Sequence, residues 1–527
     1  MLETALGFGG AFTAPHRAAA LTGRDILRQG GSAIEAMVAA AATIAVAYPH
    51  MNGLGGDAFW LIHRPGAAPV AIAGAGRAAA LATTARYADR GYASIPVRGP
   101  DAALVVPGAV ATWQAALALL GGTARFTLSQ LLADAIALAR DGVAVTPILA
   151  HTSAAKAAEL APIPGFSLAH QPDGLPLRAG DRFRQPALAA TLERLASVGL
   201  DDFYRGDIAA MQGRFLAASD SPLRQDDFAA YRAETGAPLS VTTASGTLHN
   251  IPPPSQGVAT LMALALFERL GVTEADGFAH LHGLVEATKR AYSLRNRHVA
   301  DPDAMSEDVR HWLSDAYLDK LASGIDPQRA MPWPEPSSPG DTIWMGASDA
   351  NGVVVSFIQS LYWEYGAGLT CPETGITFEN RGAGFSLQPG PNQLAPGKRP
   401  FHTLNPGLAQ LRDGRVLAFG TQGGEGQPQT MTALYSRYAL FGQGLQRAIT
   451  APRWLLGTTW ADVTTSLKLE SRFDPALVEA LQAAGHVTEV VGDFDPMMGQ
   501  AGAVVHHPGG LMEAATDPRS DGAAIAF

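Results

Sequence analysis

The sequence predicts an α+β protein in which helices pack against antiparallel sheet. Two observations lead to this prediction. Residues 104–234 and 278–303 carry apolar side chains at helical spacing, and from position 342 onward short apolar stretches alternate with hairpin turns. The chain has 527 residues, of which 47% are hydrophobic, so it can bury a large core.

The most apolar run, at 36–48, predicts a buried helix near the N-terminus. Ser32 and Glu35 form a capping-box pattern before it, and Pro49 closes it. The run is too short to cross a bilayer, which takes about 20 residues. The glycine-rich stretch 53–57 follows. It matches neither a dinucleotide fingerprint nor a P-loop, so it is interpreted as a tight turn.

The middle of the chain is predicted to be helical scaffold. Its clearest period lies at 127–142, and 278–303 forms a further helix. His280 and His282 in that helix are two residues apart, so their side chains point to different faces. They are interpreted as core or surface histidines, and no metal site is predicted.

A proline-rich, charged stretch at 324–341 interrupts the helical pattern and is predicted to be a flexible, solvent-exposed linker. Strand-like segments at 342–348 and 353–360, joined by a turn, then predict a hairpin. A second hairpin at 407–420 leads into Gly423 and Gly424. The remaining segments predict a strand, a helix and two strands at 467–471, 474–485, 486–492 and 501–507.

Composition narrows the class of function. The net charge is −10 and Lys and Arg are not clustered, which argues against nucleic acid and anionic membranes as partners and favours a small soluble ligand. Cys371 is the one cysteine, so neither an intrachain disulfide nor a cysteine-rich metal site can form. The first residues lack the pattern of a secretory signal, so a cytoplasmic protein is expected.

The junction between the linker and the first hairpin places Thr342 at the start of a strand. A threonine hydroxyl needs a base, and a free α-amine on the same residue, with a pKa near 7.7 to 8.0, can be that base. Such an amine would exist only after cleavage between Asp341 and Thr342. Local sequence leaves two interpretations open: a nucleophile released by self-cleavage, or a threonine that merely begins a strand.

Six segments favour the first interpretation, because together they resemble the γ-glutamyltransferase family of N-terminal nucleophile hydrolases. They lie at 13–62, 138–147, 341–360, 397–406, 420–430 and 515–524. The resemblance implies a four-layer αββα sandwich made as a self-cleaving proenzyme. It also implies a heterodimer of a large subunit, 1–341, and a small subunit, 342–527, without metal or organic cofactor.

The resemblance also implies roles for individual residues. Thr342 matches the nucleophile, and Ser360 matches a hydroxyl residue that contacts it. Gly423 and Gly424 match the glycine pair whose N–H groups form the oxyanion hole, and Arg77 matches the arginine that holds the substrate carboxylate.

Departures from the family pattern indicate the substrate. Where the transferases place acceptors for a glutamyl α-amino group, this chain has Tyr362, Arg381 and Gly384, and His402–Thr403 replace a serine pair. An ammonium group would meet a cation there, so a small acid amide without an α-amine fits better. This combination resembles the oxamate amidohydrolase branch, which acts in purine-ring catabolism. Arg381 is either a second carboxylate clamp or part of a structural salt bridge.

Three alternatives stay open at this point. The first is a glutathione hydrolase or γ-glutamyltransferase, and the second is a glutaryl or cephalosporin acylase-like amidase. The third is not an enzyme but an uncleaved carboxylate-binding protein that uses Arg77 and the glycine loop. Besides its small-molecule substrate, the expected partner is the chain's own cleaved subunit, and pairing into a dimer of heterodimers is compatible with the sequence.

Overall fold

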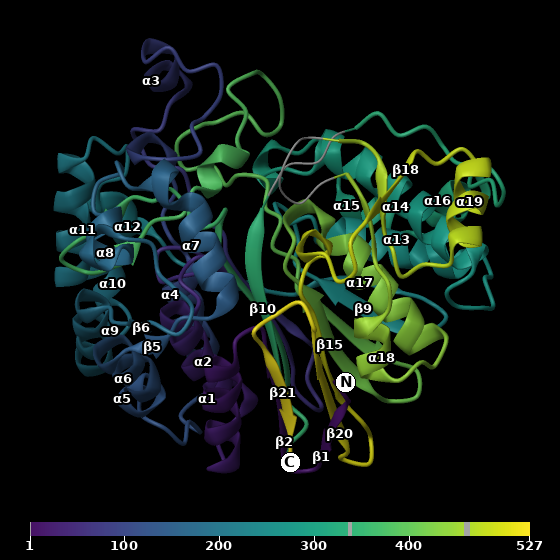
Figure 1. The fold of residues 1–527 in the computed structure, drawn as a ribbon, viewed down its shortest axis with the longest axis horizontal. Helices are drawn as coiled ribbons and strands as arrows, with labels where there is room; N and C mark the ends of the chain where they lie inside the picture. The colour runs from purple at the N-terminus through teal and green to yellow at the C-terminus, as the bar shows by residue number, and fades with distance from the viewer. Residues whose placement is uncertain (1, 336–339, 458–463) are drawn as a thin grey trace.

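The computed structural model describes residues 2–335, 340–457 and 464–527, which form two seven-stranded sheets between two groups of helices (Figure 1). In each sheet every neighbouring pair of strands is antiparallel. The first sheet has the order β1 (Ala5–Gly7), β20 (Met512–Thr516), β19 (Ala501–His506), β15 (Val416–Thr421), β14 (Gly407–Leu411), β9 (Gly246–Asn250) and β8 (Leu239–Thr242). The second has the order β21 (Ala523–Ala526), β2 (Gly10–Ala14), β10 (Asp341–Asp349), β11 (Val354–Tyr362), β3 (Asp57–His63), β4 (Val70–Gly74) and β7 (Glu234–Gly236).

Helices cover the outer face of each sheet, so the layers run helix, sheet, sheet, helix (Figure 1). On the second sheet lie α1 (Arg17–Arg28), α2 (Ala33–Ala47) and α4 (Ala109–Ala118), backed by α6 (Ala133–Asp141) and α9 (Pro186–Val198). On the first sheet lie α13 (Gly257–Arg269), α17 (Gln427–Tyr435) and α18 (Leu445–Thr450), with α14 (Phe278–His298) and α16 (Asp315–Ser323) packed on α13. The predicted four-layer αββα sandwich is confirmed.

The remaining elements are short or peripheral. The helices are α3 (Thr84–Asp89), α5 (Leu128–Leu131), α7 (Pro147–Leu160), α8 (Phe166–His170), α10 (Asp202–Arg205), α11 (Asp207–Ala218), α12 (Gln225–Ala230), α15 (Val309–Trp312) and α19 (Pro475–Ala483). The small sheets pair β5 (Val143–Ala144) with β6 (Arg182–Phe183), β12 (Thr370–Cys371) with β13 (Ile376–Thr377), and β16 (Trp454–Leu456) with β17 (Leu467–Glu470) and β18 (Thr488–Val491).

The predicted N-terminal helix is α2. Ser32 accepts a hydrogen bond from the Glu35 backbone, and the Glu35 carboxylate accepts one from the Ser32 backbone, so the capping box is real. Every residue of α2 is buried, because the helix is covered by the second sheet on one side and by α1 and α6 on others. Within the described ranges, no helix is both long and apolar enough to span a membrane.

The hairpin predicted after the linker is formed by β10 and β11, and all of its strand residues are buried. One face packs on α2, and the other meets the first sheet through Trp344, Val354 and Ile358. The prediction of a solvent-exposed linker was wrong at its C-terminal end. Gly340 is buried, and Asp341 is 2% exposed because it pairs with Tyr362 as the first residue of β10. Positions 336–339 of that linker lie outside the described residues.

Both sheets mix strands from the two sides of the Asp341–Thr342 peptide. In the second sheet β10, which begins with Asp341 and continues after this peptide, and β11, which follows it, lie between β2 and β3, which precede it. In the first sheet β14, β15, β19 and β20 lie between β9 and β1.

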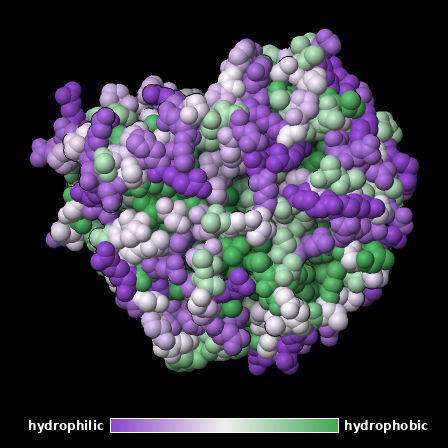
Figure 2. All heavy atoms as spheres, turned by 180° about the vertical axis from the view of Figure 1, so that it is seen from behind, coloured by the Kyte–Doolittle hydropathy of each residue, from purple (hydrophilic) through white to green (hydrophobic). Residues whose placement is uncertain are grey.

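On the face seen in Figure 2, apolar side chains gather below the centre and polar ones cover most of the remainder.

Candidate active site

Thr342 lies where the pairing of β10 with β11 shifts register, between Asp341 and Ile343. Such irregularities re-aim a side chain out of the regular ladder. The Thr342 hydroxyl contacts the carbonyl oxygen of Asp341, and the Ser360 hydroxyl donates to the same oxygen at 2.5 Å. Thr342 and Ser360 are at most 1% exposed. Two hydroxyl groups therefore converge on the carbonyl of the peptide that was predicted to be cut.

The glycine pair after β15 lies against this peptide. Gly423 and Gly424 have φ values of 122° and 51°, which favour glycine. A Cβ on Gly424 would lie 3.0 Å from the Cα and carbonyl oxygen of Gly340, so only glycine allows the two backbones to approach this closely. Gln256 holds the loop from behind, because its Nε2 donates to the Gly424 carbonyl at 2.9 Å.

Arg381 is buried beside the same site. Its guanidinium carbon lies 3.6 Å from the centre of the Tyr362 ring, and Nη2 donates to the Thr403 hydroxyl at 3.0 Å. Nε and Nη1 are buried without a hydrogen-bond partner among the described residues. A structural salt bridge therefore does not account for these two nitrogens, and their N–H groups are available to an anion.

Tyr362 joins Arg381 to the proposed nucleophile. Its backbone N–H donates to Ser360 Oγ at 2.7 Å, and its ring carbons lie 3.3 to 3.5 Å from the Cβ position of Gly340. Its φ of 83° is unusual for a residue other than glycine, and such backbone strain tends to occur at functional sites. The structure thus brings Thr342, Ser360, Tyr362 and Arg381 together.

Asp57 and His402 form a buried pair behind Arg381. Asp57 accepts hydrogen bonds from Gly76 N at 3.1 Å, Gly108 N at 3.0 Å and His402 Nε2 at 2.9 Å. His402 Nδ1 accepts from the backbone N–H of residue 404, which leaves its proton on Nε2. Burial and the nearby Arg381 lower the pKa of His402 to about 4, so the imidazole is neutral near pH 7.

Glu379 completes this buried group. It is 1% exposed, and neither carboxylate oxygen has a hydrogen-bond partner among the described residues. Burial, and then the negative charge of Asp57, raise the pKa of Glu379 well above its ordinary value, which favours the protonated form of this side chain. The carboxyl groups of Glu379, Asp57 and Glu425 all interact electrostatically with Arg381.

We expect Asp57→Ala to destabilise the fold. The change leaves three buried N–H donors, on Gly76, Gly108 and His402, without an acceptor, and each orphaned donor costs about 1–3 kcal/mol. The urea midpoint should fall markedly, when measured on uncleaved protein that carries Thr342→Ala to keep one chain. Asp57→Asn retains an acceptor oxygen and should fall less; equal midpoints for the two variants would contradict this account.

Arg77 lies apart from this group. Its side chain is 41% exposed, forms an ion pair with Glu234 at 2.7 Å and donates to the carbonyl of Gly397 at 3.0 Å. The structure does not bring its guanidinium into contact with Thr342 or Ser360, although Gly76, one residue earlier, touches the Asp57 carboxylate. Its assignment as the carboxylate clamp stays a prediction, and Glu234 would compete with a substrate for it.

A cavity of about 610 Å³ reaches the Asp341 side chain. Its walls come from α7, from the segment after β11 and from the loops that precede the glycine pair and β19. Lys156 and Glu364 face each other in it at 3.5 Å. The described lining residues are Met51, Pro147, Ile148, His151, Thr152, Ala155, Lys156, Asp341, Glu364, Gln422, Asp495, Pro496, Gln500 and Arg519.

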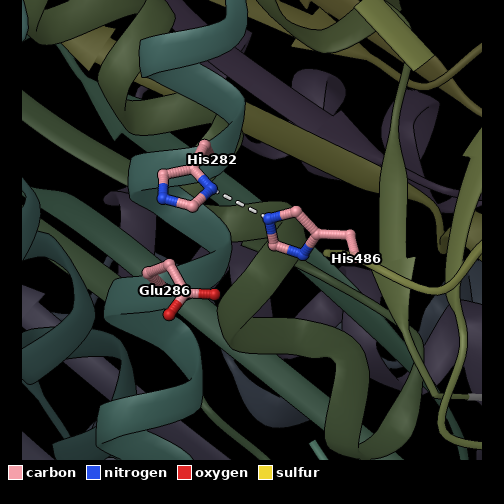
Figure 3. A group of neighbouring side chains, drawn as sticks. All are labelled: His282, Glu286 and His486. Atoms are coloured by element: carbon pink, nitrogen blue, oxygen red, sulfur yellow. Dashed lines mark hydrogen bonds between the residues drawn. The ribbon is translucent and has the colours of Figure 1, made fainter. Parts of the chain in front are cut away.

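His280 and His282 are both buried, as the core interpretation predicted. His280 bonds to Ser436 at 2.9 Å, whereas His282 lies beside Glu286 and His486 (Figure 3). In this cluster His282 Nδ1 is 2.9 Å from His486 Nε2, and His282 Nε2 is 2.8 Å from the carbonyl oxygen of Asp326.

Glu286 in the same cluster is already paired. Its two oxygens accept from the Lys289 ammonium at 2.7 Å and from the backbone N–H of Met331 at 3.0 Å. A cation would have to displace Lys289, so hydrogen bonding accounts for the group. The cluster fastens residues 326–331 to α14 shortly before the predicted cleavage position.

Comparison with known proteins bears on this site. The model of the gamma-glutamyltranspeptidase family matches residues 19–527. This chain belongs to that family. The oxamate amidohydrolase proenzyme of Klebsiella pneumoniae is 52% identical over 98% of both chains, and the glutathione hydrolase-like YwrD proenzyme of Bacillus subtilis is 38% identical over the whole of both. The crystal structure of cephalosporin acylase from Bacillus halodurans has a TM-score of 0.92 and 32% identity, and covers 100% of this chain and 97% of its own.

Membership of the gamma-glutamyltranspeptidase family makes the chain an enzyme of the N-terminal nucleophile hydrolase type, as the resemblance implied. Three buried residues around the site were missed from sequence: Asp57, Gln256 and Glu379. Asp57 alone carried a signal, since a carboxylate that opens an apolar strand needs buried donors. Gln256 and Glu379 gave none, because their neighbours come from distant parts of the chain.

Proposed function

We propose that this amidohydrolase cuts itself between Asp341 and Thr342 and then hydrolyses a small amide that carries a carboxylate, with oxamate as the substrate. The observation that carries the proposal is the position of Arg381. A buried guanidinium with two nitrogens that have no hydrogen-bond partner among the described residues lies next to Tyr362, which in turn contacts Ser360 and Gly340 at the scissile peptide. One carboxylate clamp beside one nucleophile matches a substrate with one carboxylate beside one amide.

The proposed reaction uses residues of this chain alone. The α-amine freed on Thr342 takes the proton of its own hydroxyl, and Oγ1 attacks the amide carbon. The N–H groups of Gly423 and Gly424 stabilise the oxyanion, and ammonia leaves after receiving the proton from the amine. Water, activated by the same amine, then hydrolyses the oxalyl ester and restores Thr342.

We propose Arg381 rather than Arg77 as the carboxylate clamp, and the contacts of the two side chains support this choice. Arg381 is 1% exposed and has unpaired donors, so a bound carboxylate would meet little competition from water. Arg77 is half-exposed and already pairs with Glu234. Thr403 holds the Arg381 guanidinium by accepting a hydrogen bond from Nη2, and His402, the residue before it, is bonded to Asp57. Arg77 is left as a residue at the edge of the site.

The substrate class is tested by kinetics on three amides. We expect oxamate to be hydrolysed with a kcat/KM at least about a hundredfold above that of a γ-glutamyl anilide, because an α-ammonium would lie beside the Arg381 cation. A glutaryl anilide, which lacks the ammonium but is larger, should fall between them. Ammonia and aniline release measure the three rates on the same preparation.

The result that would contradict this proposal is efficient γ-glutamyl turnover with negligible oxamate hydrolysis. It would favour a glutathione-directed activity, as in the name of the Bacillus subtilis relative. We further propose that the two cleavage products stay together as a heterodimer, which the mixed sheets support. A cytoplasmic location, a place in purine-ring catabolism and further pairing of heterodimers stay predictions.

A further inference from the structure

The side chain of Asp341 folds back onto the peptide bond that follows it. Its Oδ1 lies 2.7 Å from the backbone nitrogen of Thr342 and accepts the N–H hydrogen. Asp341 is 2% exposed, so this carboxyl group is held in place by its surroundings. The contact joins a titratable group to the nitrogen that becomes the leaving group if the chain cuts itself here.

Cleavage of this peptide bond needs negative charge to be stabilised on the carbonyl oxygen and a proton to be added to the nitrogen. When Thr342 Oγ1 bonds to the Asp341 carbonyl carbon, negative charge grows on the carbonyl oxygen, where Ser360 donates at 2.5 Å. The C–N bond then breaks only if the nitrogen gains a proton, because an amide anion is a very poor leaving group. Among the contacts of Thr342 N, the Asp341 carboxyl is the titratable group. Its Oδ1 accepts the N–H in the uncleaved chain, so the acid proton is carried on Oδ2 and the carboxyl group must turn to bring it to the nitrogen.

Several charged groups set the protonation of Asp341. Burial, and then the carboxylate of Glu364, raise its pKa well above the ordinary value, while the Thr342 N–H and Lys156 lower it. The cavity that reaches Asp341 offers a route for protons from solvent. The titratable and charged groups that line this cavity beside Asp341 are His151, Lys156, Glu364, Asp495 and Arg519, and the buried Tyr48 also interacts with it.

We propose that Asp341 is the general acid of self-cleavage, giving its proton to the Thr342 nitrogen as the C–N bond breaks. This inference rests on the proposed cleavage at 341/342. The bond from Oγ1 to carbon forms, the bond from carbon to nitrogen breaks, and the hydroxyl proton of Thr342 returns the carboxylate to its acid form. One proton thus moves from Oγ1 to nitrogen. Water then hydrolyses the ester to give the Asp341 α-carboxylate and the free Thr342 hydroxyl.

The test compares Asp341→Asn with the wild-type chain during cell-free synthesis, where cleavage is followed on denaturing gels from the moment of translation. Asparagine has the same size and still accepts the Thr342 N–H, but it cannot donate a carboxylic proton. We expect its cleavage to be slowed at least about a hundredfold, the usual contribution of a general acid. Asp495→Asn, which removes another acid lining the same cavity, should cleave at the wild-type rate.

The pH dependence separates proton donation from a merely structural role. Because the acid form is the active one, wild-type cleavage should slow as pH rises through the raised pKa of Asp341. Glu364→Gln removes the charge that raises this pKa, so the decline should begin at a lower pH. The residual cleavage of Asp341→Asn should show no such decline. Equal melting temperatures of uncleaved Asp341→Asn and uncleaved Thr342→Ala would show that both fold.

The possible results separate the proposed cleavage at 341/342 from the proposed general-acid role of Asp341. A wild-type chain that stays intact at 341/342 would overturn the proposed function. Wild-type cleavage together with equally fast cleavage of Asp341→Asn would overturn the general-acid role and leave the proposed function standing. An unshifted pH profile in Glu364→Gln would also overturn it.

Discussion

Thr342→Ala is expected to abolish both self-cleavage and turnover, because the same oxygen makes both attacks. The wild-type protein should run as two bands on a denaturing gel, and Edman sequencing of the smaller should begin Thr-Ile-Trp-Met. The alanine variant should run as one band, and its amide hydrolysis should fall on the order of 10⁴-fold or more, the scale seen when a nucleophile is removed. Ser360 would remain at the carbonyl, but in the structure it bonds to the oxygen.

The matched control is Thr342→Ser, which keeps the hydroxyl and the α-amine and loses one methyl group. It should retain part of both activities. An alanine variant that still hydrolysed its amide at the wild-type rate would mean that another hydroxyl is the nucleophile. An active wild-type preparation that stayed one intact chain would contradict the nucleophile assignment altogether.

Arg381→Ala should give the largest loss among the binding residues. The carboxylate of the substrate would be left buried without its charged partner, which costs about 2–5 kcal/mol, or roughly a 30- to 4,000-fold fall in kcat/KM. Most of the fall should appear at low oxamate concentration. Arg381→Lys should recover little of it, because lysine cannot stack on Tyr362 while it also donates to Thr403. Kinetics are to be measured on cleaved protein only.

Arg77→Ala is the control for Arg381. Its guanidinium is half-exposed and paired with Glu234, and exposed pairs contribute at most about 1 kcal/mol. Its effect on kcat/KM should therefore stay within about tenfold, and self-cleavage should be unaffected. A loss at Arg77 that exceeds the loss at Arg381 would return the carboxylate to the position that the family resemblance implied.

Local patterns predicted helices packed on antiparallel sheet, whereas the four layers and the residues of the site were implied by the resemblance to the family. Alternating apolar residues and the Asp349–Gly352 turn predict the β10–β11 hairpin. The capping box predicts the start of α2. The approach of the Thr342 and Ser360 hydroxyl groups to one carbonyl oxygen, that of Asp341, follows from the antiparallel pairing of one hairpin. These features need few contacts with the remainder of the chain.

What the sequence could not predict depends on long-range contacts. From sequence, Arg381 was either a carboxylate clamp or part of a structural salt bridge. Only the positions of all its neighbours show that Nε and Nη1 have no hydrogen-bond partner among the described residues. Asp57 was interpreted as part of a turn, although its partners include His402, 345 positions away. Asp341 was expected to be exposed because prolines and charges surround it in the sequence, whereas β-pairing with Tyr362 buries it.

The alternation of strands from before and after position 342 affects how the cleaved protein would unfold and refold. A cut at 341/342 would turn one chain into two whose strands alternate in both sheets. Separating the two chains would therefore break the backbone pairing of β10 with β2 and of β11 with β3. Unfolding would then also be dissociation, and the melting temperature would depend on protein concentration. Refolding would also include the entropic cost of bringing two separate chains together. Folding would therefore take place in the uncut chain, and the cleaved protein would be a kinetically stable assembly that does not readily refold once it has unfolded.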